Sequence, residues 1–393
     1  MKLEGIRVLD LSRFLPGPHL TMMMADHGAE VIKIEDTVSG DATRHIGPRK
    51  GGATVYYRNA NRGKRGLAVD LKSDEGREVF MRLAETADVI VETFRPGVVE
   101  RLGIGYDAVA ARAPGIVYCG ISAFGQDGPY RDRPAHDLSV GALAGTVALS
   151  VGADGAPNMP GLPPADMGGS LMALSGILMA LLRRVETGRG DYLDMSMFDA
   201  IVSWTPHITG TVFAEDRAPV PAEQRTQGGS AFYRVYRTAD GLYVTLGGSE
   251  MKFVENLLTA LERPDLIDVA RRPPGPEQAR LHEFLEATFA GRTQAEWDAW
   301  FRGRDVCFAP VQDLKAAFAD PHLQARDMLL RDDDGNEHIG IPIKFRDEPG
   351  RIEPRAPGLG ADTAEILREI GYAEAQIREL QANAVVGGGS GDA

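Results

Sequence analysis

The chain has 393 residues, of which 43% are hydrophobic and 25% are charged, as in a globular protein large enough for two domains. Its 56 acidic residues outnumber 43 basic ones, and the net charge of −13 argues against nucleic acid as the main partner. With 2 cysteines there is no disulfide scaffold, so we expect a reducing cytoplasmic location. The charged N-terminus does not read as a signal peptide, and no run of about 18 uncharged apolar residues predicts a membrane-spanning segment.

The first part of the chain alternates strand-like and helix-like segments, which predicts an α/β fold with a mostly parallel, Rossmann-like sheet and helices on both faces. The turn after the first strand reads SRFLPGPHL and lacks the G-x-G-x-x-G pattern, which argues against NAD or FAD. The expected strands are 6–12, 29–36, 66–71, 88–94 and 115–125, and the expected helices are 16–28 and 73–87.

Later segments predict a second, smaller α+β domain. An apolar helix follows Asp166, and residues 188–204 read as a strand and a helix. Asp240 and Gly241 predict the turn of a β-hairpin. We expect a large domain over 1–213, a linker over 214–231 and a small domain over 232–325. The chain is then expected to return to the large domain over 326–386, with a strand at 341–345 and a helix at 362–371, and to end in a flexible tail over 387–393.

Three polar residues are candidates for chemistry, although each also fits a structural role. His136 precedes Asp137 after a glycine-rich strand end, and Glu250 ends a hairpin strand where it could cap the following helix. Asp166 stands where a helix N-cap is expected. The histidines and cysteines show no metal-ligand spacing, and neither a G-x-S-x-G elbow nor a Walker motif occurs.

Basic residues cluster near the predicted strand ends, where a phosphorylated ligand would bind in a sheet of this kind. A solvated surface is the alternative explanation for the same cluster. The residues concerned are Arg58, Arg62, Lys64, Arg65, Arg95 and Arg101.

Taken together, the ordered stretches resemble the class III CoA-transferase superfamily, which includes the α-methylacyl-CoA racemases. They are GIRVLDLSRFLPGPHLTMMMADHGAEVIKIE, NRGKRGLAVDLKSDEG, FRPGVVERLGIGYD, FGQDGPYRDRPAHD, LPPADMGGS, TGRGDYLDMSMFDA and GYAEAQIREL. The resemblance implies an interlocked homodimer of subunits that each have a large and a small domain. It also implies contacts to coenzyme A, which we expect from Arg62, Lys64, Arg95, Arg101, Gly125 and Tyr130.

In this superfamily, Asp166 matches the aspartate that is the nucleophile of the transferases and one of two acid/base residues of the racemases. The stretches AHD and GSE supply the two racemase markers, His136 and Glu250. The segment 40–65 instead looks like that of a transferase, and Asp36 stands where some racemases carry an arginine.

The resemblance therefore favours an enzyme that racemises 2-methylacyl-CoA thioesters, with His136 and Asp166 exchanging protons. A transferase that moves CoA between carboxylic acids through Asp166 is the alternative, and a non-catalytic CoA-binding protein is a third. The substrate brings the coenzyme A, so no metal or other cofactor is expected. Small residues after Asp166, Gly168–Ser170, would admit the thioester, and Met167, Met172, Met179, Met195 and Met197 would pack in the core or contact the acyl chain.

Overall fold

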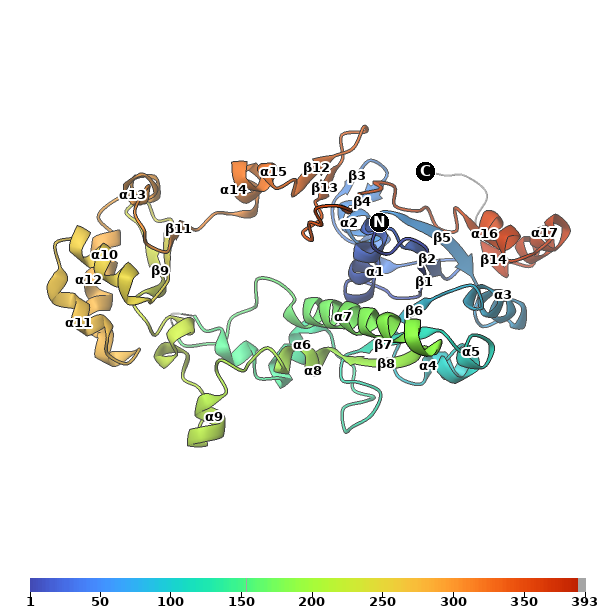
Figure 1. The fold of residues 1–393 in the computed structure, drawn as a ribbon, viewed down its shortest axis with the longest axis horizontal. Helices are drawn as coiled ribbons and strands as arrows, with labels where there is room; N and C mark the ends of the chain where they lie inside the picture. Colours follow the sequence, from blue (N-terminus) through green and yellow to red (C-terminus); the bar gives the residue numbers. More distant parts are fainter. Residues whose placement is uncertain (153, 388–393) are drawn as a thin grey trace. The chain divides into compact units, whose positions relative to one another are not determined.

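A seven-stranded sheet forms the centre of the first of two units in the computed structural model, which describes residues 1–152 and 154–387 (Figure 1). This first unit contains residues 1–144, 162–202 and those from 321 onward. Its sheet has the strand order β14-β5-β2-β1-β6-β7-β8, parallel throughout except for β14 at one edge. The strands are β1 (Arg7–Asp10), β2 (Glu30–Glu35), β5 (Lys64–Val69), β6 (Val89–Glu92), β7 (Val117–Ser122), β8 (Asp191–Ser196) and β14 (Val386–Gly387).

Helices cover both faces of this sheet and enclose two hydrophobic clusters. Neighbouring residues of a strand point to opposite faces, so Val8 packs in one cluster and Leu9 in the other. One face carries α3 (Asp74–Ala84), α5 (Tyr106–Arg112), α16 (Thr363–Glu369) and α17 (Glu374–Ala382), and the other carries α1 (Pro16–Asp26), α6 (Asp137–Leu143), α7 (Pro164–Thr187) and α8 (Met197–Val202). The predicted α/β class and parallel sheet are thus confirmed.

Shorter elements complete the first unit. A hairpin of β3 (Arg49–Lys50) and β4 (Ala53–Thr54) precedes α2 (Val55–Asn61), and α4 (Val98–Arg101) follows β6. Near the C-terminus, α15 (Pro321–Ala325) leads into a hairpin of β12 (Leu329–Arg331) and β13 (Glu337–Ile339). The strand expected at 341–345 is wrong, because β13 ends at Ile339 and the next residues form no ladder.

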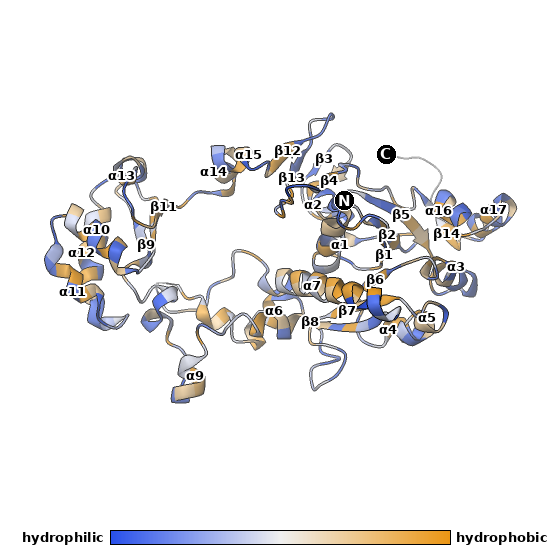
Figure 2. Cartoon of the chain, viewed as in Figure 1, coloured by the Kyte–Doolittle hydropathy of each residue, from blue (hydrophilic) through white to orange (hydrophobic). Residues whose placement is uncertain are grey.

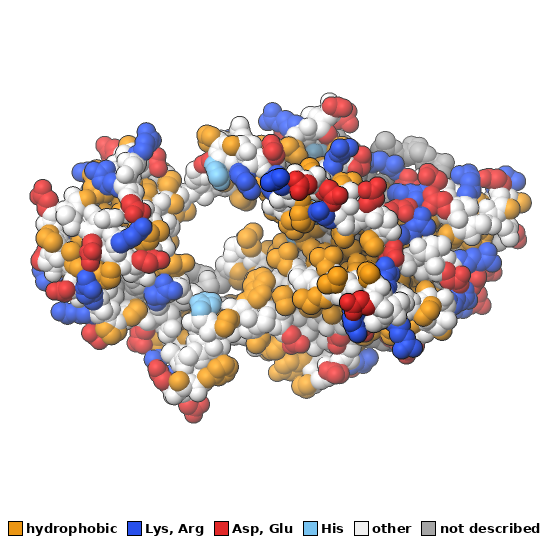
Figure 3. Space-filling model, in the orientation of Figure 1, with side chains coloured by type: hydrophobic (Ala, Val, Ile, Leu, Met, Phe, Trp, Pro, Cys, Tyr) orange, Lys and Arg blue, Asp and Glu red, His pale blue; other side chains and the backbone are white. Residues whose placement is uncertain are grey.

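Helix α7 is apolar on more sides than the sheet can cover. Ala173 and Ile177 are buried in the core, whereas Met179, Leu182 and Val185 are exposed. Figure 2 shows the helix as predominantly hydrophobic, and Figure 3 shows hydrophobic side chains gathered over it. Among the described residues, α7 alone is long and apolar enough to cross a membrane, a property that core helices share. The expectation that no segment spans a membrane therefore stays a prediction.

The second unit contains residues 145–161 and 203–320, so the structure groups 145–161 and 203–231 with the residues predicted as the small domain. Its three-stranded antiparallel sheet has the order β11-β10-β9, and the predicted hairpin turns at Gly241 with a φ of 79°. The strands are β9 (Tyr233–Arg237), β10 (Tyr243–Gly247) and β11 (Phe308–Pro310), and the helices are α9 (Gly210–Glu215), α10 (Met251–Ala260), α11 (Ile267–Ala270), α12 (Ala279–Phe289), α13 (Gln294–Phe301) and α14 (Leu314–Ala319). Of the predicted tail, Gly387 belongs to β14 and 388–393 lie outside the described residues.

Candidate active site

Asp166 lies in the first turn of α7, but it does not cap that helix. Pro163 is the N-cap and Pro164 is the first helical residue, which places Asp166 third. Proline is well suited to this first position because its φ is already helical and its missing N–H would have no partner there. The prediction of an Asp166 N-cap is therefore wrong, and its carboxylate is left for another role.

The carboxylate that does cap α7 belongs to Asp137, the first residue of α6. Its Oδ1 accepts hydrogen bonds from the backbone N–H groups of Ala165, at 2.6 Å, and Asp166, at 3.1 Å. These two groups would otherwise have no intrahelical acceptor. Asp137 thereby fixes the start of α7 against the start of α6, and it brings a second carboxylate close to Asp166.

The surroundings of Asp166 favour its neutral form. Burial raises the pKa of its carboxyl group, the negative charge of Asp137 raises it further, and His136 acts in the opposite direction, with a result of about 6. A carboxyl group with this pKa populates both its acid and its base form near neutral pH.

His136 is the N-cap residue of α6, and its side chain makes no capping hydrogen bond. The residue is exposed and opens onto a cavity of about 280 Å³ in the first unit, which Asp166 also lines. His136 and Asp166 are 30 positions apart in the chain and were predicted to share one site. In the structure both line this cavity. The other residues that line it are Arg13, Phe14, Pro16, Thr93, Phe94, Arg95, Pro96, Ile121, Ser122, Ala123, Arg131, Asp132, Arg133, Pro134, Ala135 and Met197.

The cavity wall is rich in arginine. Arg95 is the one predicted coenzyme A contact that lines it, and sequence reasoning missed Arg13, Arg131 and Arg133. Arg131 is held by hydrogen bonds from its Nε to the Gln126 carbonyl and from its guanidinium to Asp132. Guanidinium groups bind phosphate and carboxylate groups well, so the wall suits an anionic ligand. The sequence did offer a signal for these three arginines. Arg131 and Arg133 stand close to His136 in the stretch GQDGPYRDRPAHD, and Arg13 follows the end of the first strand in SRFLPGP.

Arg62 and Lys64 occupy the interior, where other groups of the protein satisfy their charges. The Arg62 guanidinium pairs with Asp26 at 2.6 Å, and Lys64 Nζ donates to Asp10 at 2.8 Å and to Asn61 at 2.8 Å. Both side chains are buried. Burial lowers the pKa of Lys64 to about 8, although Asp10 opposes that effect. This burial and pairing leave no free charge for a ligand, so the predicted contacts of these two residues to coenzyme A stay predictions that the geometry does not favour.

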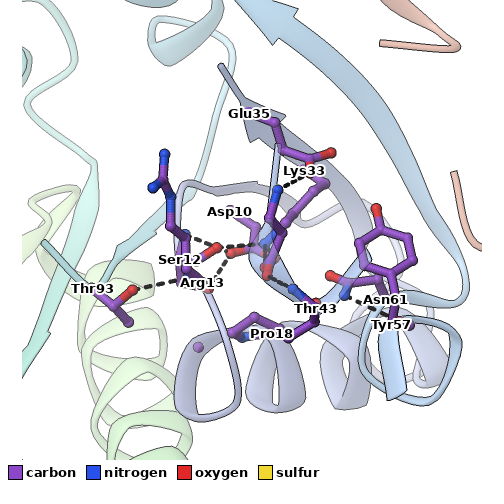
Figure 4. Close-up of polar contacts among 12 residues, drawn as sticks. Asp10, Ser12, Arg13, Pro18, Lys33, Glu35, Thr43, Tyr57, Asn61 and Thr93 are labelled. Carbon is purple, nitrogen blue, oxygen red and sulfur yellow. Dashed lines mark hydrogen bonds and ion pairs between the residues drawn. The ribbon is translucent and has the colours of Figure 1, made fainter. Parts of the chain in front are cut away.

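Asp10 is the centre of this buried network, which lies beneath the loop after β1 (Figure 4). Burial disfavours its charged form, but Lys33 and Lys64 hold the pKa of its carboxyl group well below the ordinary value. Lys33 also pairs with Asp41 at 3.0 Å, and the Ser12 hydroxyl donates to Asp10. The network anchors the 11–15 loop that forms one side of the cavity.

The remaining predicted contacts lie outside the cavity lining. Arg101 is exposed on α4, and Gly125 has a φ of 85° and donates its N–H to Ser122 Oγ at 2.9 Å. The Tyr130 ring packs against Phe124, with 5.4 Å between ring centroids. Their predicted contacts to coenzyme A remain predictions.

Glu250 belongs to the second unit. It is the exposed N-cap residue of α10, and its side chain makes no capping hydrogen bond. The simple capping role considered for it is therefore wrong, and its role toward His136 remains a prediction. Within the described residues, 1–152 and 154–387, no group of three or more His, Cys, Asp or Glu could hold a metal ion.

The small residues after Asp166 pack against neighbouring helices, and the predicted entry of a thioester beside them stays a prediction. A Cβ at Gly169 would lie 2.8 Å from Met197 Cγ, and Ser170 Oγ lies 2.9 Å from His19 Nδ1 on α1. Gly168, Gly169 and Ser170 are all buried. They let α7 approach α1 and α8 closely, which sets the position of its first turn. Of the methionines, Met197 lines the cavity, Met195 packs against the core, and Met172 and Met179 are exposed.

Comparison with known proteins agrees with the resemblance found in the sequence. The family model described as CoA-transferase family III matches residues 3–363. An acyl-CoA transferase of Fusarium pseudograminearum is 33% identical, over 98% of this chain and 88% of that protein. Human succinyl-CoA:glutarate CoA-transferase is 30% identical (98% and 90%), and mouse alpha-methylacyl-CoA racemase is 32% identical (98% and 98%).

Solved structures show the same similarity. A CAIB/BAIF family protein from Brucella suis has a TM-score of 0.80 and 30% sequence identity to this chain. The similarity covers 94% of this chain and 99% of the Brucella suis chain.

Proposed function

The chain belongs to CoA-transferase family III, and on that premise we propose that it is an acyl-CoA racemase or epimerase that inverts the α-carbon of 2-methylacyl-CoA thioesters. The observation that carries the proposal is the cavity that His136 and Asp166 line together. Inversion at a carbon next to a carbonyl needs one base and one acid on opposite faces of the substrate, and these two residues can supply both.

In the proposed reaction, one of the two residues takes the α-proton as the C–H bond breaks. The electron pair moves into an enolate, whose negative charge resides on the thioester oxygen. The other residue then gives its proton to the opposite face of the α-carbon, and the roles exchange for the enantiomer. The pKa of Asp166, about 6, supports this role because both of its protonation states are accessible near neutral pH.

The arginines of the cavity support an anionic substrate. Arg13, Arg95, Arg131 and Arg133 line it, and the phosphates of coenzyme A are ligands that guanidinium groups prefer. We further propose that the enzyme is a homodimer in which Glu250 of one subunit orients His136 of the other. The exposed apolar face of α7 supports self-association, because such a face is stabilised when a partner covers it.

A transferase is the second candidate, and two observations favour it. Asp166 lines the cavity, where a nucleophile could reach a substrate, and the relatives named above include a succinyl-CoA:glutarate CoA-transferase and an acyl-CoA transferase. In that reaction, the Asp166 oxygen would attack the thioester carbonyl and release the CoA thiolate. The thiolate would then attack the Asp166 carbonyl of the resulting anhydride, release the first carboxylate and leave CoA bound to Asp166 as a thioester. The carboxylate of the second acid would attack this thioester and expel the thiolate, which would take the new acyl group from the second anhydride and restore the Asp166 carboxylate.

Incubation of a 2-methylacyl-CoA in deuterated water, with and without an acceptor acid, separates the two functions. A racemase exchanges the α-proton without any acceptor. A transferase moves CoA only when the acceptor is present, and hydroxylamine traps an acyl or CoA adduct at Asp166. Mass spectrometry reads both outcomes in one sample.

A further inference from the structure

Phe14 has a backbone conformation that L-amino acids with a large side chain rarely adopt. Its φ is 63°, in the left-handed region, where Cβ clashes with the neighbouring carbonyl group. Its side chain is 40% exposed and lines the cavity that contains His136 and Asp166. Because Phe14 is exposed, core packing does not explain why a phenylalanine stands here. Backbone preference does not explain it either, since glycine would be less strained at this φ.

The loop around Phe14 is held on both sides, so the strained conformation persists. The Arg13 backbone N–H donates to Thr93 Oγ1 at 2.9 Å, and the Ser12 backbone N–H donates to Asp10 Oδ1 at 3.0 Å (Figure 4). On the other side, Gly17 lies so close to Ser12 that a Cβ there would overlap the serine side chain. Strain that the surroundings enforce in this way is typical of functional sites.

The ring of Phe14 meets the imidazole ring of His136. Their centroids are 6.0 Å apart, and their planes are nearly perpendicular, at 85°. This is the edge-to-face arrangement that aromatic rings prefer. The His136 side chain makes no capping bond to α6. The aromatic contact is therefore a restraint on an exposed imidazole that has to face a substrate.

We infer that Phe14 is a positioning residue, whose ring holds the His136 imidazole in the orientation required for proton transfer at the cavity. The catalytic part of this inference rests on the proposed function, whereas the restraint on the imidazole can be tested without it. The left-handed backbone is what directs a side chain of the 11–15 loop to His136. Replacement of Phe14 should therefore affect the rate of the proton transfer more than the binding of the substrate.

Nuclear magnetic resonance of the ¹⁵N-labelled histidine rings tests the restraint in the free enzyme. A His136→Gln variant identifies the His136 signals. Because an aromatic ring shifts the resonances of protons beside it, we expect Phe14→Leu and Phe14→Gly to move the His136 carbon-bound proton signals, and Phe14→Tyr to retain them. Asp327→Gly is the matched control, since Asp327 has a φ of 53° and does not line the cavity.

Kinetics of α-deuteration test the consequence. A misplacement of about 1 Å can cost roughly 10²-fold in rate, so Phe14→Leu and Phe14→Gly should lower kcat by up to that factor with little change in KM. Phe14→Tyr and Asp327→Gly should stay near the wild-type kcat. Unchanged His136 signals in Phe14→Leu would show that the ring does not restrain the imidazole, and a rise in KM alone would show that Phe14 only contacts the substrate. Either result would overturn the inference. If wild-type enzyme deuterates no acyl-CoA while the His136 signals move as expected, the proposed function fails and the restraint stands.

Discussion

The carboxylate of Asp137 accepts a 3.1 Å hydrogen bond from the backbone N–H of Asp166. The same carboxylate therefore caps α7 and places its negative charge beside the Asp166 carboxyl group, whose pKa it raises. A helix N-terminus ordinarily stabilises a carboxylate in its first turn. Here burial and Asp137 outweigh that effect, and Asp166 gains the pKa of an acid/base residue.

Removal of the Asp137 charge should separate its two roles. Asp137→Asn keeps an oxygen that can accept from Ala165 and Asp166, and it removes the charge that raises the pKa of Asp166. The acidic limb of the pH–rate profile should therefore move to lower pH with little change in thermal stability. Asp137→Ala also loses the cap and should destabilise the fold by about 1 kcal/mol. An acidic limb that stays in place in Asp137→Asn would contradict this role.

Asp166→Asn should abolish activity and change how stability depends on pH. In the folded protein the pKa of Asp166 is raised to about 6, so the folded state holds a proton that the unfolded state releases at lower pH. The wild type therefore loses stability as pH rises from about 4 to 6, and the asparagine variant does not. The variant should have the higher melting temperature at pH 7.5 and lose that advantage below pH 4. Equal melting temperatures at pH 7.5 would argue against the raised pKa.

His136→Ala should remove one of the two proton-transfer groups. General acid–base catalysis contributes typically 10²–10⁴-fold, and we expect a loss of α-carbon inversion in that range. Binding of the acyl-CoA, measured by calorimetry, should change little because the arginines of the cavity remain. His136→Gln serves as the matched variant, since it keeps polarity and most of the volume without the basic nitrogen. Retention of most of the activity in both variants would exclude His136 as an acid/base residue.

Much of the fold was accessible from the sequence because hydrophobic periodicity is local. The strands of the parallel sheet and the Ser73-capped helix α3 were found in this way, with Ser73 accepting a hydrogen bond from the Gly76 N–H. The prediction of a strand at 341–345 was wrong. Alternating apolar residues form a strand only when a neighbouring strand pairs with them, and residues 341–345 are in no ladder. Residues 145–161 carry no such pattern, and the sequence therefore could not show that they belong with the second unit.

His136 and Asp166 of the cavity could be predicted from the sequence, whereas most of the arginines that line it could not. His136 and Asp166 stand in distinctive stretches, whereas a basic residue beside a strand end can point to solvent, to a ligand or into the core. Arg62 and Lys64 point inward because Asp26 and Asp10, more than 30 positions earlier in the chain, supply their counter-charges. Only the three-dimensional structure reveals such pairs. The positive φ of Phe14 is likewise invisible in the sequence, since the strain comes from contacts of its loop to Thr93 and Asp10.

Mixed dimers test whether Glu250 serves His136 of a partner subunit. Chains that carry His136→Ala and Glu250→Gln should each be weakly active alone. If the site is shared, a heterodimer of the two carries both lesions in one site and leaves the other site intact, so part of the activity returns. Isolation through two different affinity tags gives the heterodimer, with each homodimer as its control. A heterodimer no more active than the homodimers would place Glu250 within its own subunit's function.

The central claim is that His136 and Asp166 exchange protons with the two faces of an α-carbon. Its most direct test starts from a single enantiomer of a 2-methylacyl-CoA in deuterated water, without an acceptor acid, and analyses both enantiomers at early conversion. The account predicts that the product of opposite hand carries one deuterium at the α-carbon, because its new proton comes from a group that has exchanged with solvent. Absence of α-deuterium in both enantiomers, together with transfer of CoA when an acceptor acid is added, would contradict it.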